Sequence, residues 1–293
     1  MIDINQIRLD IETRRKILTS LSNPSSGQPE MTEFDSAFLC GLLKKYHPQK
    51  IVEVGVCGGG TTAIMLQCLE DIGQEYKMYS IDIESKYPRD NKLEAGFIGK
   101  QALESVFIPK GMKGTHKFYL GTILPFVIDE IGRNIDFVIL DTAHVLPGEV
   151  LDFLTVLPYL KDNAVVVLHD VSWNQVSYKD IHQHATGALF SAVVADKFLN
   201  FISNDPNALR YPNIAAFQIN SDTMKYIENV FLALIIRWRY VPEDKYLSGY
   251  YNKFVEYYPV KLTELFREIA KFNAYNVLKE LQSLGKSKTD MLY

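Results

Sequence analysis

The sequence has few cysteines, no excess of basic residues and no long apolar run. Its 31 Lys and Arg residues are outnumbered by 35 Asp and Glu residues, which gives a formal net charge of -4. Nucleic-acid binding requires clustered positive charge, and no Lys/Arg block is present, so we expect no nucleic-acid partner. The longest apolar run near the end covers residues 230–236. Because a membrane span needs about 20 residues, we expect no membrane association.

The three cysteines, Cys40, Cys57 and Cys68, cannot all pair with one another. Each lies in a helix-like or strand-edge pattern, which favours free thiols in a reducing compartment over a disulfide framework. The N-terminal segment is charged and amphipathic and lacks the apolar core of a signal peptide. These features predict a cytoplasmic protein.

Strand-like and helix-like segments alternate through the first 170 residues. An amphipathic helix is expected over residues 2–21, followed by a loop over residues 23–31. The expected strands then cover residues 50–54, 77–82, 117–120, 135–141 and 164–170, and the expected helices cover residues 32–46, 61–72, 96–106, 123–131 and 148–160. Strands rich in Val and Ile, separated by helices, predict an α/β fold with a doubly wound, mostly parallel sheet. Its ligand site should lie at the carboxyl ends of the strands.

The pattern changes after the fifth strand. Residues 188–202 are expected to be helical or mixed, and residues 213–219 to add an edge strand. From Asp222 onward the sequence is helical and rich in tyrosine. We therefore expect an N-terminal helix and loop over residues 1–31, a cofactor-binding domain over residues 32–221 and a helical C-terminal appendage over residues 222–293.

A glycine-rich turn follows the first expected strand, in the run VEVGVCGGGTT over residues 52–62. Glycines let the backbone approach a ligand closely, and a helix begins after them. The spacing from Gly58 through Gly60 to Ala63 superficially fits a dinucleotide site. However, Glu53 places a negative charge where a phosphate would lie. That acid favours S-adenosylmethionine, which presents an ammonium and a sulfonium and carries no phosphate.

A second acid, Asp82, ends the next strand and is placed to accept hydrogen bonds from ribose hydroxyls, with Glu84 as a nearby alternative. Either cofactor would use such an acid, so Asp82 does not discriminate between them.

Four motifs in order, VEVGVCGGGTT, YSIDIES, DFVILDTAH and VVVLHDV, resemble class I S-adenosylmethionine-dependent methyltransferases. More narrowly, they are similar to the catechol O-methyltransferase-like group and its relatives that act on sugars and antibiotics. The resemblance covers roughly residues 32–175 and implies a Rossmann-like methyltransferase domain. The cofactor-binding residues that we expect are Glu53, Gly55, Gly58, Gly59, Gly60, Thr61, Asp82, Gly121, Thr122 and Asp141.

Asp141 and Asp170 end two expected neighbouring strands, so their carboxylates should meet beside the cofactor. In the metal-dependent relatives these two positions hold a metal ion, and the next residue is usually Asn or Asp. Here that residue is Val171, which removes one ligand. Two interpretations stay open: the acids bind Mg²⁺, or they orient loops and hydrogen-bond the acceptor.

His144 follows Asp141 by three residues, at the place where the catechol enzymes have a lysine base. An imidazole titrates near neutrality and can accept a hydroxyl proton. A histidine that caps the next helix or packs on Asp170 is the structural alternative. Trp173 and Tyr178 are further candidates, to line the acceptor pocket.

The sequence thus predicts an S-adenosylmethionine-dependent O-methyltransferase that acts on a small hydroxylated acceptor, such as a sugar, a glycan precursor or a secondary metabolite. His144, Asp141 and Asp170 are its expected catalytic residues. The alternatives are an NAD-dependent oxidoreductase or sugar-nucleotide enzyme on the same fold, and a non-catalytic cofactor-binding or assembly protein. Apolar patches on the helical tail need covering, which is compatible with a homodimer.

Overall fold

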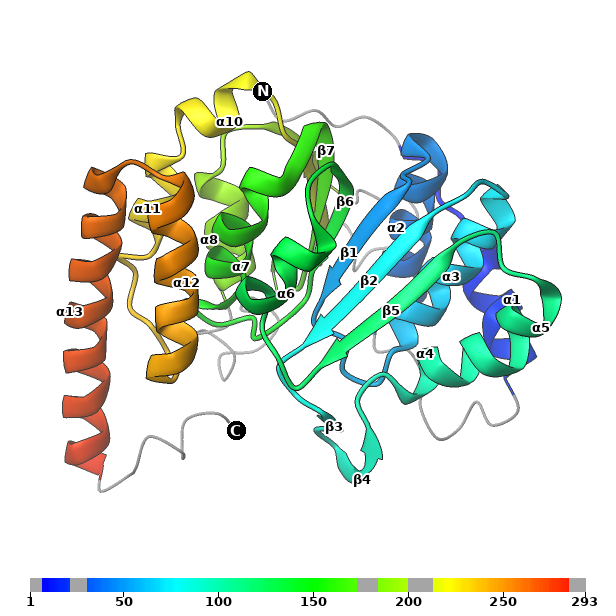
Figure 1. Ribbon diagram of the computed structural model, residues 1–293, viewed down its shortest axis with the longest axis horizontal. Coiled ribbons are helices and arrows are strands. Elements are labelled where there is room, and N and C mark those ends of the chain that lie inside the picture. Colours follow the sequence, from blue (N-terminus) through cyan, green and yellow to red (C-terminus); the bar gives the residue numbers. More distant parts are fainter. Residues whose placement is uncertain (1–6, 22–30, 173–183, 200–212, 285–293) are drawn as a thin grey trace.

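The computed structural model describes residues 7–21, 31–172, 184–199 and 213–284. A seven-stranded sheet in the order β5-β2-β1-β6-β7-β9-β8 forms its centre (Figure 1). The strands are β1 Lys50–Val54, β2 Lys77–Asp82, β5 Thr115–Leu120, β6 Ile135–Leu140, β7 Leu160–His169, β8 Asp196–Leu199 and β9 Ile214–Gln218. Strands β5 to β7 in this order are parallel, whereas β9 and β8 are each antiparallel to the strand before them. The predicted doubly wound, mostly parallel sheet is confirmed.

Helices cover both faces of the sheet (Figure 1). On one face lie α1 Glu12–Ser20, α2 Glu33–Tyr46, α3 Gly60–Ile72, α4 Phe97–Ala102, a π-helix Leu103–Phe107 and α5 Ile108–Lys110. On the other lie α6 Leu124–Ile131, α7 Gly148–Val156, α8 Ala185–Ala192, α11 Glu228–Ala233, α12 Asp244–Tyr257 and α13 Val260–Leu284. The short helix α10 Ser221–Lys225 follows β9, the 3-10 helix Leu157–Tyr159 follows α7, and a hairpin of β3 Lys86–Tyr87 and β4 Asp90–Glu94 follows β2.

Alternation along the strands explains the two apolar layers, because successive side chains point to opposite faces. In β1, Ile51 packs into the core with α2 and α3, whereas Val52 and Val54 pack into the core with α6 and α7. No helix in the described parts of the chain is long and apolar enough to span a bilayer.

The predicted N-terminal helix over residues 2–21 is too long. Within the described residues the helix begins only at Glu12, because the Asp10 carboxylate accepts hydrogen bonds from the backbone N–H groups of Glu12 (3.2 Å) and Thr13 (3.3 Å). Such a side chain satisfies donors that a helix start leaves unpaired. The N-cap predicted at Thr32 is confirmed, since its hydroxyl accepts from the Asp35 N–H at 3.1 Å.

The edge strand is β8 and not the segment predicted for that place. The strand predicted over residues 213–219 is β9, Ile214–Gln218, which lies between β7 and β8. The segment predicted as helical or mixed, residues 188–202, contains the end of α8 and the strand β8. Neither the helical period of 3.6 residues nor the strand period of two continues there over enough residues to be recognised.

The C-terminal helices pack on the same apolar layer as the sheet. Phe231, Trp238, Phe254 and Phe266 are buried in one cluster with β6, β7 and α7. The helical nature of this region is as predicted, and the boundary at residue 222 stays a prediction.

Candidate active site

A cavity of about 260 Å³ lies at the carboxyl ends of the parallel strands. Strand ends and the loops after them line one side of it, with Gly55 after β1, Asp82 on β2, Thr122 after β5 and Asp141 after β6. Carboxylates of Asp82, Glu84, Asp141 and Asp152 also line it, and no Lys or Arg does within the residues described. The cavity is therefore suited to a ligand with positive charge and unsuited to a pyrophosphate.

The turn after β1 brings three segments close together. Gly55 has a φ of 93°, and a Cβ there would lie 1.9 Å from the Asp141 carbonyl oxygen. Gly59, with a φ of 82°, precedes α3, and a Cβ there would lie 2.8 Å from the Gly96 backbone. Only glycine combines this backbone conformation with this close approach. The turn therefore requires glycine at both positions.

Glu53 lies beneath the turn and does not line the cavity. It is fully buried, and its Oε2 accepts hydrogen bonds from Thr62 (2.7 Å) and Ser80 (2.5 Å). Burial raises the pKa of Glu53 to about 8, although the two hydroxyls favour the ionised form. Through Thr62, Glu53 ties β1 to the start of α3 and so shapes the loop between them.

Asp82 holds the same loop from the cavity side. Its Oδ2 accepts hydrogen bonds from the backbone N–H groups of Val56 and Cys57, both at 2.8 Å, and its Oδ1 accepts one from Glu84 at 2.8 Å. The carboxylate therefore keeps only part of its acceptor capacity for a ligand. Glu84, the alternative acid for ribose, also lines the cavity.

Asp141 connects the cavity to a group of buried ionisable side chains. Its Oδ1 lies 3.1 Å from His169 Nδ1 and 3.8 Å from His144 Nε2. Burial alone would raise the pKa of Asp141, but His169 and His144 lower it below its ordinary value. His169 Nε2 lies 3.7 Å from Asp35 Oδ2, and the pKa of this buried imidazole is raised well above its ordinary value by Asp141 and Asp35.

His144 stands between carboxylates. Its Nε2 lies 3.2 Å from Asp170 Oδ2, and its Nδ1 lies 3.4 Å from Glu149 Oε1. Burial opposes the charged imidazole, but Glu149, Asp141 and Asp170 outweigh it and raise the pKa of His144 to about 9. Asn213 fixes Asp170 by donating a hydrogen bond from its side-chain amide to Oδ1 at 2.5 Å. His144 and Asp170 both have positive φ, 57° and 58°, which is uncommon for such residues and concentrates at functional sites.

Asp141, His144 and Asp170 each offer one ligand atom, and these atoms lie within 4.8 Å of one another. The sequence had placed only the two acids as metal ligands, and the structure adds the imidazole to the same point. Because His144 offers Nε2 to both roles, it cannot be a metal ligand and a free base at once. The predicted catalytic residues are thus brought together.

The cofactor residues predicted from the sequence divide into two groups. Gly55, Asp82, Thr122 and Asp141 line the cavity, whereas the remaining ones shape the turns around it: Glu53, Gly58, Gly59, Gly60, Thr61 and Gly121. Trp173 and Tyr178, predicted for the acceptor pocket, lie outside the described residues.

Sequence reasoning missed one group of cavity-lining residues, Asp152 of α7 with Tyr240 and Tyr250 of the C-terminal region. The Tyr250 hydroxyl donates a hydrogen bond to Asp152 Oδ1 at 2.8 Å. Burial raises the pKa of Asp152 to about 7, with Glu149 adding to this effect and Tyr250 opposing it. The richness of the tail in tyrosine was the only sequence signal, because the contact joins residues 98 positions apart.

Residues 52–171 match the family model described as a methyltransferase domain. This stretch, less than half of the chain, is thus similar in sequence to a methyltransferase domain. The prediction of an enzyme of the S-adenosylmethionine-dependent methyltransferase class is confirmed at the level of this domain and its fold. A search of curated proteins found no match.

Solved structures with a similar fold include an O-methyltransferase from Bacillus cereus in complex with SAH, at 14% identity and a TM-score of 0.47, covering 71% of this chain and 91% of that one. Another is the O-methyltransferase TomG from Streptomyces achromogenes in complex with SAM, at 16% identity and a TM-score of 0.47, covering 72% of this chain and 90% of that one.

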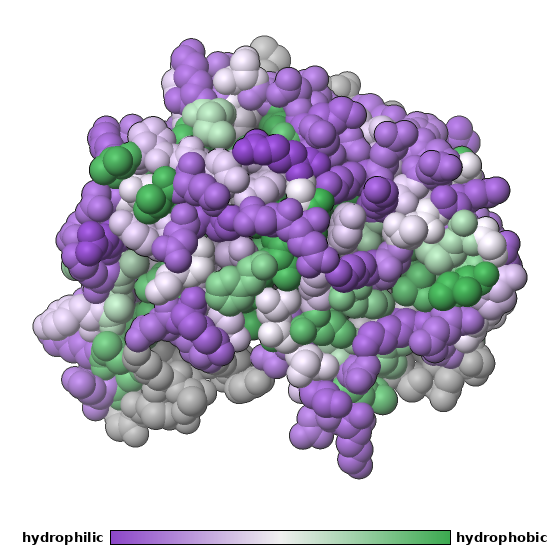
Figure 2. All heavy atoms as spheres, in the orientation of Figure 1, coloured by the Kyte–Doolittle hydropathy of each residue, from purple (hydrophilic) through white to green (hydrophobic). Residues whose placement is uncertain are grey.

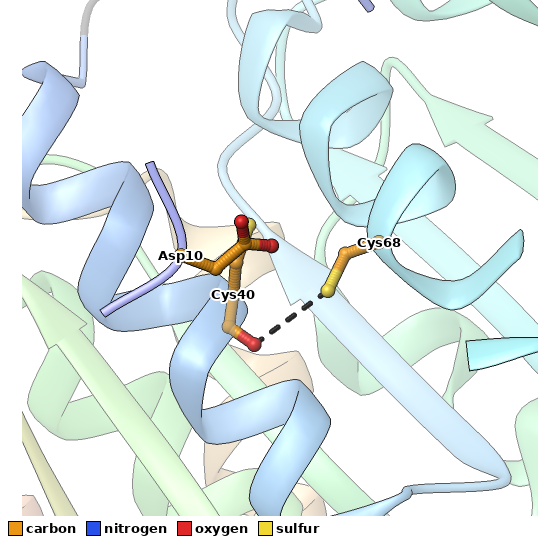
Figure 3. A group of neighbouring side chains, drawn as sticks. All are labelled: Asp10, Cys40 and Cys68. Atoms are coloured by element: carbon orange, nitrogen blue, oxygen red, sulfur yellow. Dashed lines mark hydrogen bonds between the residues drawn. The ribbon is translucent and has the colours of Figure 1, made fainter. Parts of the chain in front are cut away.

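A second group with metal-binding residue types, Asp10, Cys40 and Cys68, lies between α1, α2 and α3 (Figure 3). Cys68 Sγ faces the Cys40 carbonyl oxygen at 3.6 Å, and both cysteines are buried and unpaired. Asp10 already forms an ion pair with Lys44 at 2.7 Å. A hydrogen bond with Cys68, together with burial, raises the pKa of the Cys40 thiol. A neutral thiol and a competing ammonium disfavour a cation here, so this group is structural.

Proposed function

We propose that this methyltransferase uses S-adenosylmethionine to methylate a hydroxyl group of a small acceptor, such as a sugar, a glycan precursor or another secondary metabolite. The observation that carries the proposal is the meeting of Asp141, His144 and Asp170 beside the acid-lined cavity that begins at Gly55. S-adenosylmethionine supplies the electrophilic methyl group. The protein must supply alignment of the acceptor and a destination for its proton.

In this proposal the cofactor occupies the cavity. The backbone at Gly55 admits it closely, Asp82 and Glu84 accept hydrogen bonds from its ribose, and Thr122 and Asp141 complete the wall. Glu53, Gly58, Gly59, Gly60, Thr61 and Gly121 hold the surrounding turns in shape. The cluster of carboxylates favours this cationic cofactor over NAD, whose pyrophosphate they would repel.

His144 is proposed as the base that accepts the acceptor's proton. With a pKa raised to about 9, its imidazole is protonated at neutral pH while only carboxylates face it. A positive charge that enters the cavity next to Asp141 lowers the pKa of a neighbouring imidazole. In the neutral ring, Glu149 accepts the hydrogen bond from Nδ1 and so orients the imidazole, which leaves the lone pair of Nε2 to take up the acceptor's proton. Asp170, 3.2 Å from Nε2, then stabilises the imidazolium that forms.

The residues also fit a divalent cation, because two carboxylates and an imidazole present ligand atoms within 4.8 Å of one another. Asp141 and Asp170 would hold it, with His144 as a third donor, and it would lower the pKa of the acceptor hydroxyl. Oxygen ligands suit Mg²⁺, whereas the added imidazole widens the choice to Mn²⁺ and similar ions. In that case Asp141 and Asp170 would position the acceptor through the ion.

A homodimer and a cytoplasmic location remain part of the proposal. The face shown in Figure 2 is largely hydrophilic, with separate hydrophobic patches. Large apolar side chains on α11 and α13 and in the segment after α11 are exposed: Leu232, Ile235, Ile236, Phe272 and Tyr275. Their clustering on the C-terminal helices supports association of two copies through this region.

The test is a calorimetric titration of the full chain with S-adenosylmethionine, S-adenosylhomocysteine and NAD, each with and without Mg²⁺. We expect the first two to bind and NAD not to bind. An Asp82→Ala variant should lose affinity for both, because the loop at Val56 and Cys57 loses its anchor. Binding of NAD alone would overturn the proposal and favour redox chemistry on the same fold.

A further inference from the structure

Three residues that line the cavity have no part in the proposed methyl transfer. They are Asp152, Tyr240 and Tyr250, which line it together with the strand-end residues Gly55 and Asp82. Asp152 lies on α7, and both tyrosines come from the C-terminal region beyond the methyltransferase match at residues 52–171. A part of the chain outside the matched domain therefore closes the proposed cofactor cavity.

Asp152 keeps unused capacity to accept hydrogen bonds. Its Oδ1 accepts from Tyr250 at 2.8 Å, whereas its Oδ2 has only a long contact with the Thr142 hydroxyl at 3.4 Å. Asp152 is only 4% exposed, so water can supply few of its hydrogen bonds. A carboxylate accepts about four hydrogen bonds, and buried polar groups normally have hydrogen-bond partners. A donor group of a ligand would supply a hydrogen bond that Asp152 lacks.

Other parts of the cavity wall are apolar. Ile83, Leu124 and Ala143 line the cavity together with Asp82 and Asp152. Apolar walls suit the faces of a planar ring, the Asp82 carboxylate suits ribose hydroxyls, and the Asp152 carboxylate suits an amino group on the edge of the ring. Adenosine has these three features.

We infer that Asp152, oriented by Tyr250 and flanked by Tyr240, recognises the adenine base of the cofactor by accepting a hydrogen bond from its exocyclic amino group. The inference rests on the proposed function, since it assigns the base end of the same cofactor site. It makes the C-terminal helices part of the cofactor site and gives Asp152 a role in specificity.

The packing of α12 explains how Tyr250 reaches this place. Gly249 lets α12 approach α6 so closely that a Cβ there would lie 2.6 Å from the Phe126 ring. At the other end of α12, the Tyr258 hydroxyl donates to the Leu154 carbonyl oxygen at 2.6 Å. These two contacts fix α12 on α6 and α7, and Tyr250 lies between them in the sequence.

The experiment compares the affinities of S-adenosylhomocysteine and S-inosylhomocysteine, in which a carbonyl oxygen replaces the exocyclic amino group. At a pH about two units above the Asp152 pKa of about 7, where the carboxyl group is ionised, we expect the wild-type protein to prefer the adenosine compound by on the order of 10- to 100-fold. The oxo group would then face the Asp152 carboxylate without a shared proton. In Asp152→Asn the ratio should fall to about one or invert, because the amide also donates. Tyr250→Phe should reduce the ratio by a smaller factor.

Tyr76→Phe is the matched control, since it removes a tyrosine hydroxyl that donates to a carboxylate, that of Glu70 at 2.7 Å, and Tyr76 does not line the cavity. Its ratio should equal that of the wild type, and thermal unfolding should confirm that all variants are folded. If the wild type binds S-adenosylhomocysteine but the ratio is the same in Asp152→Asn and Tyr250→Phe, the inference is wrong and the proposed function stands. If the wild type binds neither compound nor S-adenosylmethionine, the proposed function fails, and the inference with it.

Discussion

Two carboxyl groups that line the same cavity, Asp141 and Asp152, have opposite environments. Asp141 lies between the imidazoles of His169 and His144, which lower its pKa although desolvation acts to raise it. Asp152 faces the hydroxyls of Tyr250 and Thr142 and the nearby acid Glu149, and burial raises its pKa to about 7. Cationic partners thus keep one carboxylate charged, whereas neutral partners leave the other close to its midpoint at neutral pH.

The difference suits Asp141 to catalysis and Asp152 to recognition of a ligand. A carboxylate that stays ionised beside His144 can hold a cation or an acceptor at the reacting end. A carboxyl group held by a tyrosine offers a directional acceptor with little fixed charge, which suits the edge of a neutral base.

Replacing Asp141 by Asn should have the largest effect. The substitution preserves the size but leaves the buried His169 imidazole without its nearest charge partner, which destabilises the fold by about 3 kcal/mol. Methyl transfer should fall by on the order of 10³-fold, because His144 loses one of the charges around it. Chemical denaturation and a methyl-transfer assay measure the two effects.

The control for this change is Asp162→Asn, the same substitution at an exposed position of β7. It should alter stability by no more than about 0.5 kcal/mol. Equal destabilisation by the two variants would show that the charged side chains around Asp141 add nothing to the free energy of unfolding.

His144→Ala should lower kcat by roughly 10²-fold or more while cofactor affinity changes little, because His144 does not line the cavity. Single-turnover methyl transfer and calorimetry separate the two quantities. His144→Gln, which can orient a hydroxyl but cannot accept its proton, should be as slow as His144→Ala. Full turnover in either variant refutes the base assignment.

Asp152→Asn should change how stability depends on pH. The folded-state pKa of Asp152 is about 7 against an ordinary value of 3.8, so the folded protein binds the proton more tightly than the unfolded chain does. The free energy of unfolding therefore carries a contribution that decreases as pH rises from about 4 to 7, with a slope of up to about 1.4 kcal/mol per pH unit. Denaturation at several pH values should show this slope in the wild type relative to the variant, and parallel curves would contradict it.

Tyr250→Phe should have a smaller effect on stability than Asp141→Asn, about 1 kcal/mol near neutral pH, because one hydrogen bond to Asp152 is lost. The loss should increase above pH 7, where the carboxylate is ionised and its hydrogen bonds are stronger. Urea denaturation at pH 6 and pH 8 provides the measurement, and an effect that is larger at the lower pH would be the opposite of this expectation.

Local pattern was sufficient to predict the parallel strands and the glycine turn. The segments at residues 50–54 and 77–82 are apolar enough to be identified as strands with the bounds that the structure has. The meeting of Asp141 with Asp170 followed from the rule that parallel strands place their carboxyl ends at one edge.

Contacts between distant parts of the chain were not predictable. Asp152 and Tyr250 are adjacent only because α12 returns across α6 and α7, and no local pattern encodes that return. The order of β9 and β8 and the late start of α1 depend likewise on one backbone pairing and one capping carboxylate. Such features depend on tertiary packing, which overrides local propensity.

The most direct measurement is a crystal structure of the full chain with S-adenosylhomocysteine. We predict that the ligand fills the cavity, with its thioether beside Gly55 and Asp141, its ribose at Asp82 or Glu84 and its adenine edge at Asp152. A ligand bound elsewhere, or one whose base points away from Asp152 and Tyr250, would contradict the assignment of this cavity to the cofactor and of Asp152 to its base.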